Sequence, residues 1–224
     1  MWLEPMSCSD FIIGWYERAC AETLKERAKP GAFCLDLGAN LGYFSLFLSR
    51  LVGQGGKVVA FEPMPENLKV LRENAELSDG NLSIVGAAVG DRSGEIELIS
   101  TAAERYTKAA SAVSYYLEGA AKTTTVPSLR LDEYFAGADR LPDLIKVDVE
   151  GAELAVLSGA RETILRGKPD LVIEIHGWGS PEAEQVLGVL REFGYIVRVF
   201  GLRAREAHCL AFPASGLPTG GKRS

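Results

Sequence analysis

Residues 33–52 read FCLDLGANLGYFSLFLSRLV and contain the pattern that decides the fold. The apolar run up to Gly38 is typical of a short buried strand. Glycines at positions 38 and 42 then lead into an apolar helical stretch over 43–52. A strand that turns through glycines into a helix is typical of the ligand-binding start of an open α/β sheet, where glycines let the backbone approach a ligand closely.

The rest of the chain alternates strands with helices of ten to sixteen residues. Strands are expected at 57–63, 81–90, 143–151, 169–177, 195–201 and 206–213, and helices at 66–77, 152–167 and 181–194. A further strand, EIELIS at 95–100, is expected to form a hairpin with the strand over 81–90, and residues 123–135 to be half strand and half helix. This order predicts an α/β fold with a mostly parallel seven-stranded sheet, one antiparallel edge strand and helices on both faces.

The same pattern predicts how the chain is divided. Residues 1–30 are expected to be a helical lead-in, 31–213 one α/β domain and 214–224 a loose tail. The segment 101–125 is rich in Ala, Thr, Ser and Tyr without clear periodicity, so an insertion or lid is expected there.

Composition excludes several classes of protein. The chain has 224 residues, 47% of them hydrophobic, and a formal net charge of −6. One domain of this size buries a sufficient core without disulfides or a structural metal. The acidic balance argues against nucleic acid as a partner, and the lack of a long apolar run argues against a membrane span. With no basic leader at the N-terminus, a cytoplasmic protein is expected.

The four cysteines, Cys8, Cys20, Cys34 and Cys209, form no C-x-x-C pair. They are expected to be reduced thiols, most of them buried. The oligomeric state is not indicated by the sequence.

The first candidate site is the turn Asp36-Leu37-Gly38-Ala39-Asn40-Leu41-Gly42 together with Glu62 at the end of the next strand. A carboxylate at Glu62 is well placed to accept hydrogen bonds from ribose hydroxyls. The spacing from Gly38 to Gly42 and the negative charge of Asp36 suit a cationic sulfonium better than the pyrophosphate of NAD. S-adenosylmethionine is therefore the favoured cofactor, with Asn40 able to bind its methionine end. The alternative is that the glycines only form a tight turn and Asp36 caps the backbone that follows.

The second candidate site lies at the ends of the fourth and fifth parallel strands. Lys146, Asp148 and Glu150 alternate on one strand, and Glu174 and His176 alternate on its neighbour. In one interpretation Lys146 neutralises Asp148 or Asp36 while Glu150 caps the next helix. In the other, Asp148 lies beside the methyl donor and Glu150 faces the substrate.

His176 is the hypothetical general base, because an imidazole of ordinary pKa near 6.5 is suited to accept a hydroxyl proton at neutral pH. Glu150 or Glu174 could orient it. A divalent Mg²⁺ or Mn²⁺ held by Asp148, Glu150, Glu174 and His176 is possible but not favoured. The other histidine, His208, is expected to be structural. One or two of the aromatic residues Tyr43, Tyr115, Tyr116 and Trp178 are expected to line the substrate pocket.

These motifs resemble those of the FkbM family of S-adenosylmethionine-dependent methyltransferases. The resemblance covers roughly residues 30–180 and rests on DLGANLG (36–42), AFEP (60–63), LDEYF (131–135), LIKVDVEGAELAVLSGA (144–160) and IEIH (173–176). It implies a Rossmann-like class I methyltransferase fold and O-methylation of a sugar or another small natural-product hydroxyl. It also implies cofactor contacts from Asp36, Gly38, Asn40, Gly42 and Glu62, with Asp148, Glu150 and His176 near the reacting centre.

The sequence thus predicts an S-adenosylmethionine-dependent O-methyltransferase for a hydroxylated small molecule. The predicted cofactor residues are Asp36, Gly38, Asn40, Gly42, Glu62, Ala87 and Asp148, and the predicted catalytic residues are His176, Glu150 and Asp148. Two alternatives stay open: a cofactor-binding module without catalysis that serves a partner enzyme, and an NAD-dependent oxidoreductase.

Overall fold

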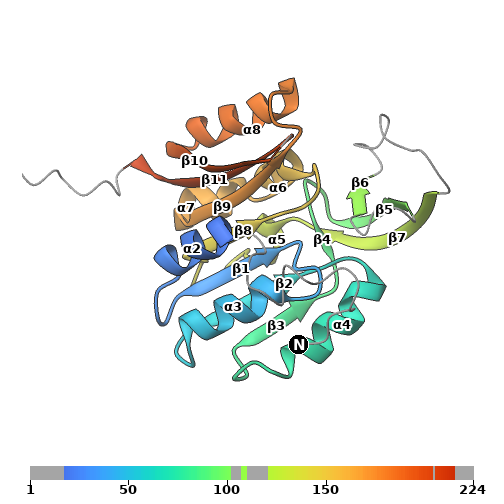
Figure 1. Ribbon diagram of the computed structural model, residues 1–224, viewed down its shortest axis with the longest axis vertical. Coiled ribbons are helices and arrows are strands. Elements are labelled where there is room, and N and C mark those ends of the chain that lie inside the picture. The colour runs from blue at the N-terminus through green and yellow to red at the C-terminus, as the bar shows by residue number, and fades with distance from the viewer. Residues whose placement is uncertain (1–17, 102–106, 110–120, 204, 215–224) are drawn as a thin grey trace, which may run out of the picture.

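The chain forms three layers, in which a seven-stranded sheet lies between two layers of helices (Figure 1). A computed structural model describes residues 18–101, 107–109, 121–203 and 205–214. Several predictions lie outside these residues: the first half of the lead-in helix, Cys8, Tyr115 and Tyr116, most of the expected lid and nearly all of the tail.

The main sheet has the strand order β10-β11-β9-β8-β1-β2-β3. Its strands are β1 (Phe33–Leu37), β2 (Lys57–Phe61), β3 (Leu82–Val85), β8 (Leu144–Val147), β9 (Asp170–His176), β10 (Tyr195–Arg203) and β11 (Glu206–Pro213). Only β11 runs antiparallel to its neighbours β9 and β10. One antiparallel strand near an edge of the sheet is therefore confirmed. That strand is β11, which lies next to the edge strand β10. The strand order reverses between β1 and β8, and ligands of α/β sheets bind beside such a switch point.

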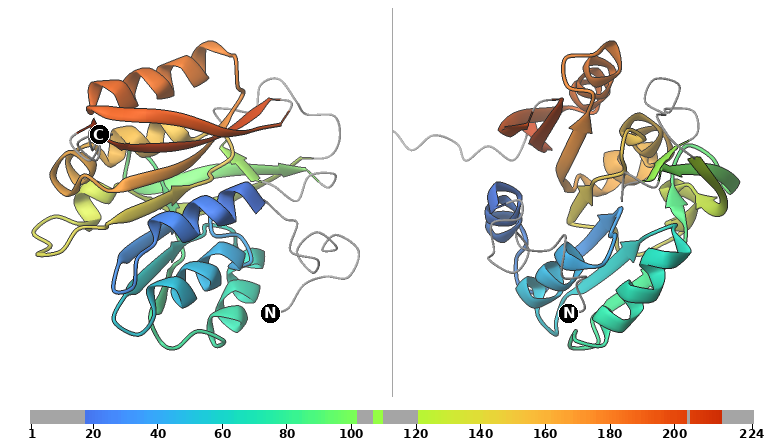
Figure 2. Two further views of the ribbon diagram at one scale, coloured as in Figure 1. Left: turned by 60° about the vertical axis from the view of Figure 1, so that its left-hand side comes forward. Right: turned by 45° about the vertical axis from the view of Figure 1, so that its right-hand side comes forward.

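Helices cover both faces of this sheet (Figure 2). The first face carries α2 (Arg18–Arg27) and α3 (Tyr43–Val52), which pack on strand residues such as Val58 and Leu144, and α4 (Pro65–Ala75), which packs on Ala60. The second face carries α5 (Leu131–Tyr134), α6 (Glu153–Gly159), α7 (Arg161–Gly167) and α8 (Pro181–Glu192), around a core that includes Leu35 and Ile145. Because both faces are covered, the central strands are apolar on both sides except for the buried pair Asp36 and Lys146.

A second sheet of four strands was not predicted. It consists of β4 (Ala88–Val89), β7 (Ala121–Leu129), β5 (Gly94–Thr101) and β6 (Thr107–Ala109), in that order. The prediction that 95–100 pairs with the strand over 81–90 is wrong, because β5 pairs with β7 and β6. Leu98 of β5 and Val126 of β7 are buried together with Met64, and this small apolar cluster stabilises the separate sheet.

The helix predicted over 152–167 is divided in two. Helix α6 ends at Gly159 and α7 begins at Arg161, with Ala160 between them at φ −114°. A Cβ on Gly159 would lie 1.8 Å from the carbonyl oxygen of Gly90, so the glycine allows α6 to pack directly on the strand end after β4. The described cysteines, Cys20, Cys34 and Cys209, are buried and form no disulfide with one another.

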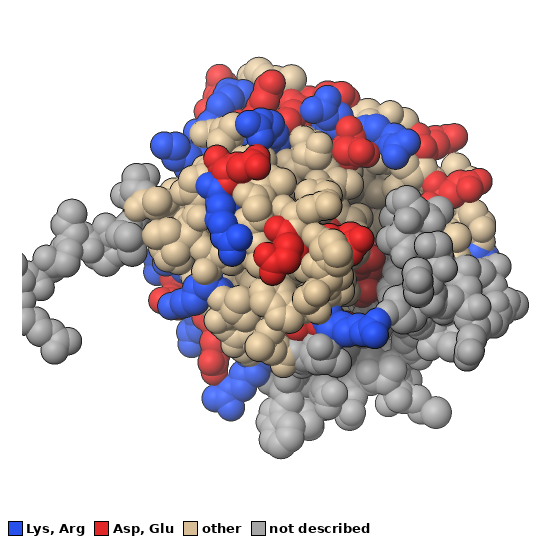
Figure 3. All heavy atoms as spheres, turned by 90° about the horizontal axis from the view of Figure 1, so that it is seen from above, with Lys and Arg blue, Asp and Glu red and all other residues tan. Residues whose placement is uncertain are grey.

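The surface at the top of Figure 1, where α8 lies, carries interspersed charges of both signs (Figure 3). Helix α8 contributes Glu182, Glu184, Arg191 and Glu192. Among the helices of the described residues, none is long and apolar enough to cross a membrane.

Candidate active site

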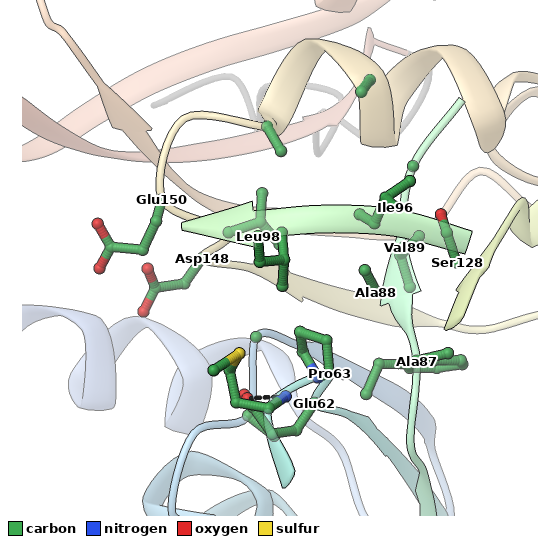
Figure 4. A pocket seen from close by; sticks show the side chains of 18 of the residues that line it. Glu62, Pro63, Ala87, Ala88, Val89, Ile96, Leu98, Ser128, Asp148 and Glu150 are labelled. Carbon is green, nitrogen blue, oxygen red and sulfur yellow. Dashed lines mark hydrogen bonds between the residues drawn. The ribbon is translucent and has the colours of Figure 1, made fainter. Parts of the chain in front are cut away.

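A cavity of about 770 Å³ opens at the carboxyl ends of β1, β2 and β8, beside the switch point. Its walls come from the turn after β1, the end of β2, the segment from β3 to β5 and the loop after β8. Figure 4 shows Asp148 and Glu150 at one end, Glu62 and Pro63 at the side, and Ala87 and Val89 towards the other end. The strand that carries Leu98 crosses over the cavity, so the second sheet forms its roof.

The turn after β1 has its shape because Gly38 packs against the end of β8. Gly38 has φ +79°, and a Cβ there would lie 1.8 Å from the carbonyl oxygen of Asp148. Its backbone N–H donates to the Phe61 carbonyl, and the Asp148 N–H donates to the Leu37 carbonyl. The glycine therefore lets two strand ends meet. It also lines the cavity, where the expected close approach of its backbone to a ligand stays a prediction. Asn40 follows at φ +50°, a conformation that asparagine tolerates.

Glu62 fixes this turn from the end of β2. One carboxylate oxygen accepts the Asn40 backbone N–H at 2.9 Å, and the other accepts the Met64 backbone N–H at 2.9 Å and the Asn67 side-chain amide at 3.1 Å. Only 4% of Glu62 is exposed, and burial raises the pKa of its carboxyl group against these lowering hydrogen bonds. The carboxylate is thus held in a defined position on the cavity wall, with acceptor capacity left for a ligand.

We expect Glu62→Gln to weaken S-adenosylmethionine binding about tenfold to a hundredfold, or about 1–3 kcal/mol. The amide nitrogen of the glutamine would face a backbone N–H of the turn and could not accept a hydrogen bond from a ribose hydroxyl. Calorimetric titration measures the change. The matched control is Glu66→Gln, an exposed acid on α4 that pairs with Lys122. Equal affinities of the two variants would contradict the assignment.

Lys146 of β8 joins the two candidate sites. Its ammonium nitrogen lies 3.3 Å from Asp36 Oδ1 and 3.3 Å from Asp148 Oδ2. Asp36 is fully buried and also accepts a hydrogen bond of 2.6 Å from the Ser45 hydroxyl. The interpretation in which Lys146 neutralises aspartates therefore holds for both Asp36 and Asp148, and the charge of Asp36 is offset before any cation binds.

The loop after β8 brings Glu150 to the cavity in an unusual conformation. Glu150 has φ +52° and Gly151 has φ +95°. The Gly151 N–H donates to Glu153 Oε1 at 2.9 Å, and the same oxygen lies 2.7 Å from His176 Nδ1. His176 Nε2 in turn lies 3.3 Å from Glu150 Oε2. The imidazole is therefore placed between two carboxylates.

The surroundings of His176 change its acidity. Burial alone lowers the pKa of His176, but the hydrogen bond and charge of Glu153, followed by the charges of Glu150 and Asp148, outweigh burial and raise the pKa to about 9. The sequence analysis assumed an ordinary pKa near 6.5, and that assumption is wrong. At neutral pH the ring carries its proton, so His176 in the ligand-free protein is not available as a base.

The structure brings some of the predicted residues into the cavity and places others behind it. The cavity is lined by Gly38, Asn40, Glu62, Ala87, Asp148 and Glu150. Asp36, Gly42, Glu174 and His176 do not line it. Asp36 lies behind Lys146. Gly42, which precedes α3 at φ +90°, packs on the Leu71 side chain of α4.

The four predicted metal-ligating residues do not form one group. Asp148, Glu150 and His176 lie together, and Glu174 and Glu206 form a second group with the same histidine. Glu174 is buried and its Oε2 lies 3.2 Å from His208 Nε2. Tyr43 lines the cavity, whereas Trp178 packs on the main core.

Two features of the site were missed from the sequence. Glu153 was assigned only to a helix, although its carboxylate contacts both Gly151 and His176. The signal for it was its place at the start of a helix just after a glycine, where a carboxylate can accept the backbone N–H groups of the preceding turn. The roof residue Leu98 gave no such signal, because its role depends on pairing with β7.

A seven-stranded sheet of this order, with one antiparallel strand and a carboxylate-lined cavity at the switch point, defines the Rossmann-like methyltransferase class of folds. The model of the FkbM methyltransferase domain matches residues 36–197, and the chain belongs to that family.

The chain is similar to several named proteins. It is 29% identical to the hexuronic acid methyltransferase AglP of Haloferax volcanii, over 74% of this chain and 65% of AglP. It is 27% identical to the 31-O-demethyl-FK506 methyltransferase FkbM of Streptomyces tacrolimicus, over 75% of this chain and 74% of that protein.

Two solved structures share the fold. The FkbM methyltransferase from Methylobacillus flagellatus is 20% identical with a TM-score of 0.55, over 86% of this chain and 50% of that one. Fibrillarin from Aeropyrum pernix, in complex with natively bound S-adenosyl-L-methionine, is 17% identical with a TM-score of 0.56, over 87% of this chain and 74% of that one. This chain thus spans half of the first structure and about two thirds of AglP.

Proposed function

We propose that this protein is an S-adenosylmethionine-dependent methyltransferase that methylates a hydroxyl group of a small molecule, a sugar or another natural product. The observation that carries the proposal is one continuous cavity. Its wall includes Glu62, a carboxylate placed where it could accept hydrogen bonds from ribose hydroxyls, and the acid pair Asp148 and Glu150 lies at one end. The family supports it, and the names of AglP and FkbM connect related proteins with a hexuronic acid and a natural product.

The residues of the cavity fit this cofactor. Glu62 would accept the ribose hydroxyls, Asn40 would bind the amino-acid end, and Ala87 would offer apolar surface to the purine. Asp148 supplies negative charge near a cation, because Lys146 is shared with Asp36. Asp36 and Gly42 support the turn from behind instead of touching the ligand.

The cofactor would supply an electrophilic methyl group on a sulfonium, so that an O–CH₃ bond forms as the CH₃–S bond breaks and a neutral thioether leaves. The hydroxyl must then lose its proton to the protein. Glu150 lines the cavity and is the proposed acceptor of that proton. His176 contacts Glu150 from outside the cavity, so we assign it as a positioning residue that holds this carboxylate.

Catalysis is proposed to need no metal ion. The donor groups of Asp148, Glu150 and His176 are close enough to hold one, so the proposal is tested directly. Activity should survive dialysis against EDTA without added Mg²⁺ or Mn²⁺. Loss of activity that either ion restores would replace the proposal with metal-assisted methylation.

The function itself is tested with a panel of hydroxylated sugars and natural products and a cofactor labelled at its methyl group. We expect label to appear on an oxygen of at least one acceptor, and Glu150→Gln to abolish most of that turnover while S-adenosylmethionine still binds. Cofactor binding without any product from the panel would favour the non-catalytic module. Hydride transfer with NAD would favour the oxidoreductase.

The rate should depend on pH through His176. Below its pKa of about 9 the imidazolium holds Glu150 in place, and above it that ion pair is lost. We therefore expect kcat/KM to be constant through neutral pH and to fall as pH rises through about 9. His176→Asn should be slower and lack this fall. A rate that instead rises towards pH 9 would make neutral His176 the base.

A further inference from the structure

Glu153 connects two parts of the site that are distant in sequence. One oxygen of its carboxylate accepts the Gly151 backbone N–H at 2.9 Å and lies 2.7 Å from His176 Nδ1. Glu153 is 3% exposed and does not line the cavity. Its contacts therefore act on neighbouring residues and not on a ligand.

The first contact holds a strained turn. A left-handed conformation is unfavourable for residues other than glycine and asparagine, and Glu150 adopts one at φ +52°. Such a conformation persists only where the surroundings fix it. The bond from Gly151 N–H to Glu153 fixes the turn directly after Glu150 and so directs the Glu150 side chain into the cavity.

The second contact orients the imidazole. With Nδ1–H donated to Glu153, the other ring nitrogen is directed at Glu150. Further carboxylates close to the ring belong to Asp148, Glu174 and Glu206. A histidine surrounded by so many acids could take several orientations, and the short contact with Glu153 selects one of them.

We infer that Glu153 is a positioning residue of this site, which sets the orientation of both Glu150 and His176 through a single hydrogen-bond acceptor. The inference rests on the proposed function for its effect on turnover, but its structural part holds independently of that function.

Three variants of Glu153 separate positioning from packing. Glu153→Gln keeps an acceptor oxygen, and that oxygen must face the two donors. Glu153→Leu keeps most of the volume and removes the acceptor. Glu153→Asp keeps the charge but withdraws it by one methylene. We expect Glu153→Leu and Glu153→Asp to lower kcat about tenfold to a hundredfold with little change in the Kd for S-adenosylmethionine. Glu153→Gln should retain most of the activity of the wild type.

A spectroscopic signature that does not depend on turnover accompanies these rates. In the ligand-free wild type, nuclear magnetic resonance should show a downfield, slowly exchanging Nδ1 proton of His176. The chain has only two histidines, so the signal is readily assigned. The proton should persist in Glu153→Gln and disappear in Glu153→Leu. The exposed Glu162→Gln on α7 should leave both the signal and the rate unchanged.

Equal rates for the Leu, Asp and Gln variants would overturn the inference, because packing alone would then explain the residue. Absence of the protected Nδ1 proton in the folded wild type would also overturn it, even if the Leu variant does not fold. If the proton is present and no acceptor is ever methylated, the proposed function fails while the structural part of the inference holds.

Discussion

Gly38→Ala is expected to destabilise the protein by about 2–5 kcal/mol and to abolish cofactor binding. A left-handed conformation costs an alanine about 1–2 kcal/mol, and forced overlap in a packed region costs about 1–3 kcal/mol more. The overlap is severe here because the new Cβ would lie 1.8 Å from a backbone oxygen of Asp148, which cannot rotate away. Chemical denaturation measures the loss of stability, and calorimetry measures the loss of binding.

Gly80→Ala is the matched control for this prediction. Gly80 has φ +80°, nearly the same as Gly38 at φ +79°, but a Cβ there meets no atom within 4 Å. It should therefore cost only the conformational part, about 1–2 kcal/mol. If both alanine variants lose the same stability and Gly38→Ala still binds the cofactor, the packing of the β1 turn on the end of β8 is not what the site needs.

The second large effect is expected at Lys146. Lys146→Met would leave the fully buried Asp36 without its cation, and breaking a buried ion pair costs about 3–5 kcal/mol. Denaturant unfolding should show this loss. Adding Asp36→Asn to the same variant should recover part of it, because the uncompensated charge is then removed.

The exposed pair between Lys122 and Glu66 provides the comparison. Lys122→Met should cost no more than about 1 kcal/mol. A loss below about 1 kcal/mol in Lys146→Met would show that Asp36 does not depend on Lys146, and the account of Lys146 as the neutralising partner of this buried carboxylate would fail.

The order of elements could be predicted from sequence because it is a local property. The buried strand and glycine turn at 33–42, and the acid at the end of the next strand, Glu62, each depend on residues within a few positions of one another. The switch point then follows from strand order, and it places Glu62, Asp148 and Glu150 on one cavity. Of the predicted strand-end residues, these three line the cavity, whereas Glu174 and His176 do not.

The missed features depend on pairings between distant segments. Strand β5 pairs with β6 and β7, which lie within or begin inside the segment 101–125 expected to be an insertion or lid, so the second sheet had no local signal. The pKa of His176 is raised by Glu153, and the charge of Asp36 is offset by Lys146; in both cases the partner comes from another element. A sequence shows which groups titrate, but the neighbours that shift their pKa values are fixed only by the tertiary structure.

The central claim is that the cavity beside Glu62 binds S-adenosylmethionine. Calorimetric titration of the protein with S-adenosylmethionine, with its demethylated product and with NAD tests it most directly. The account predicts that the first two bind with one site per chain and that NAD gives no heat of binding. Binding of NAD with no response to the other two would contradict it.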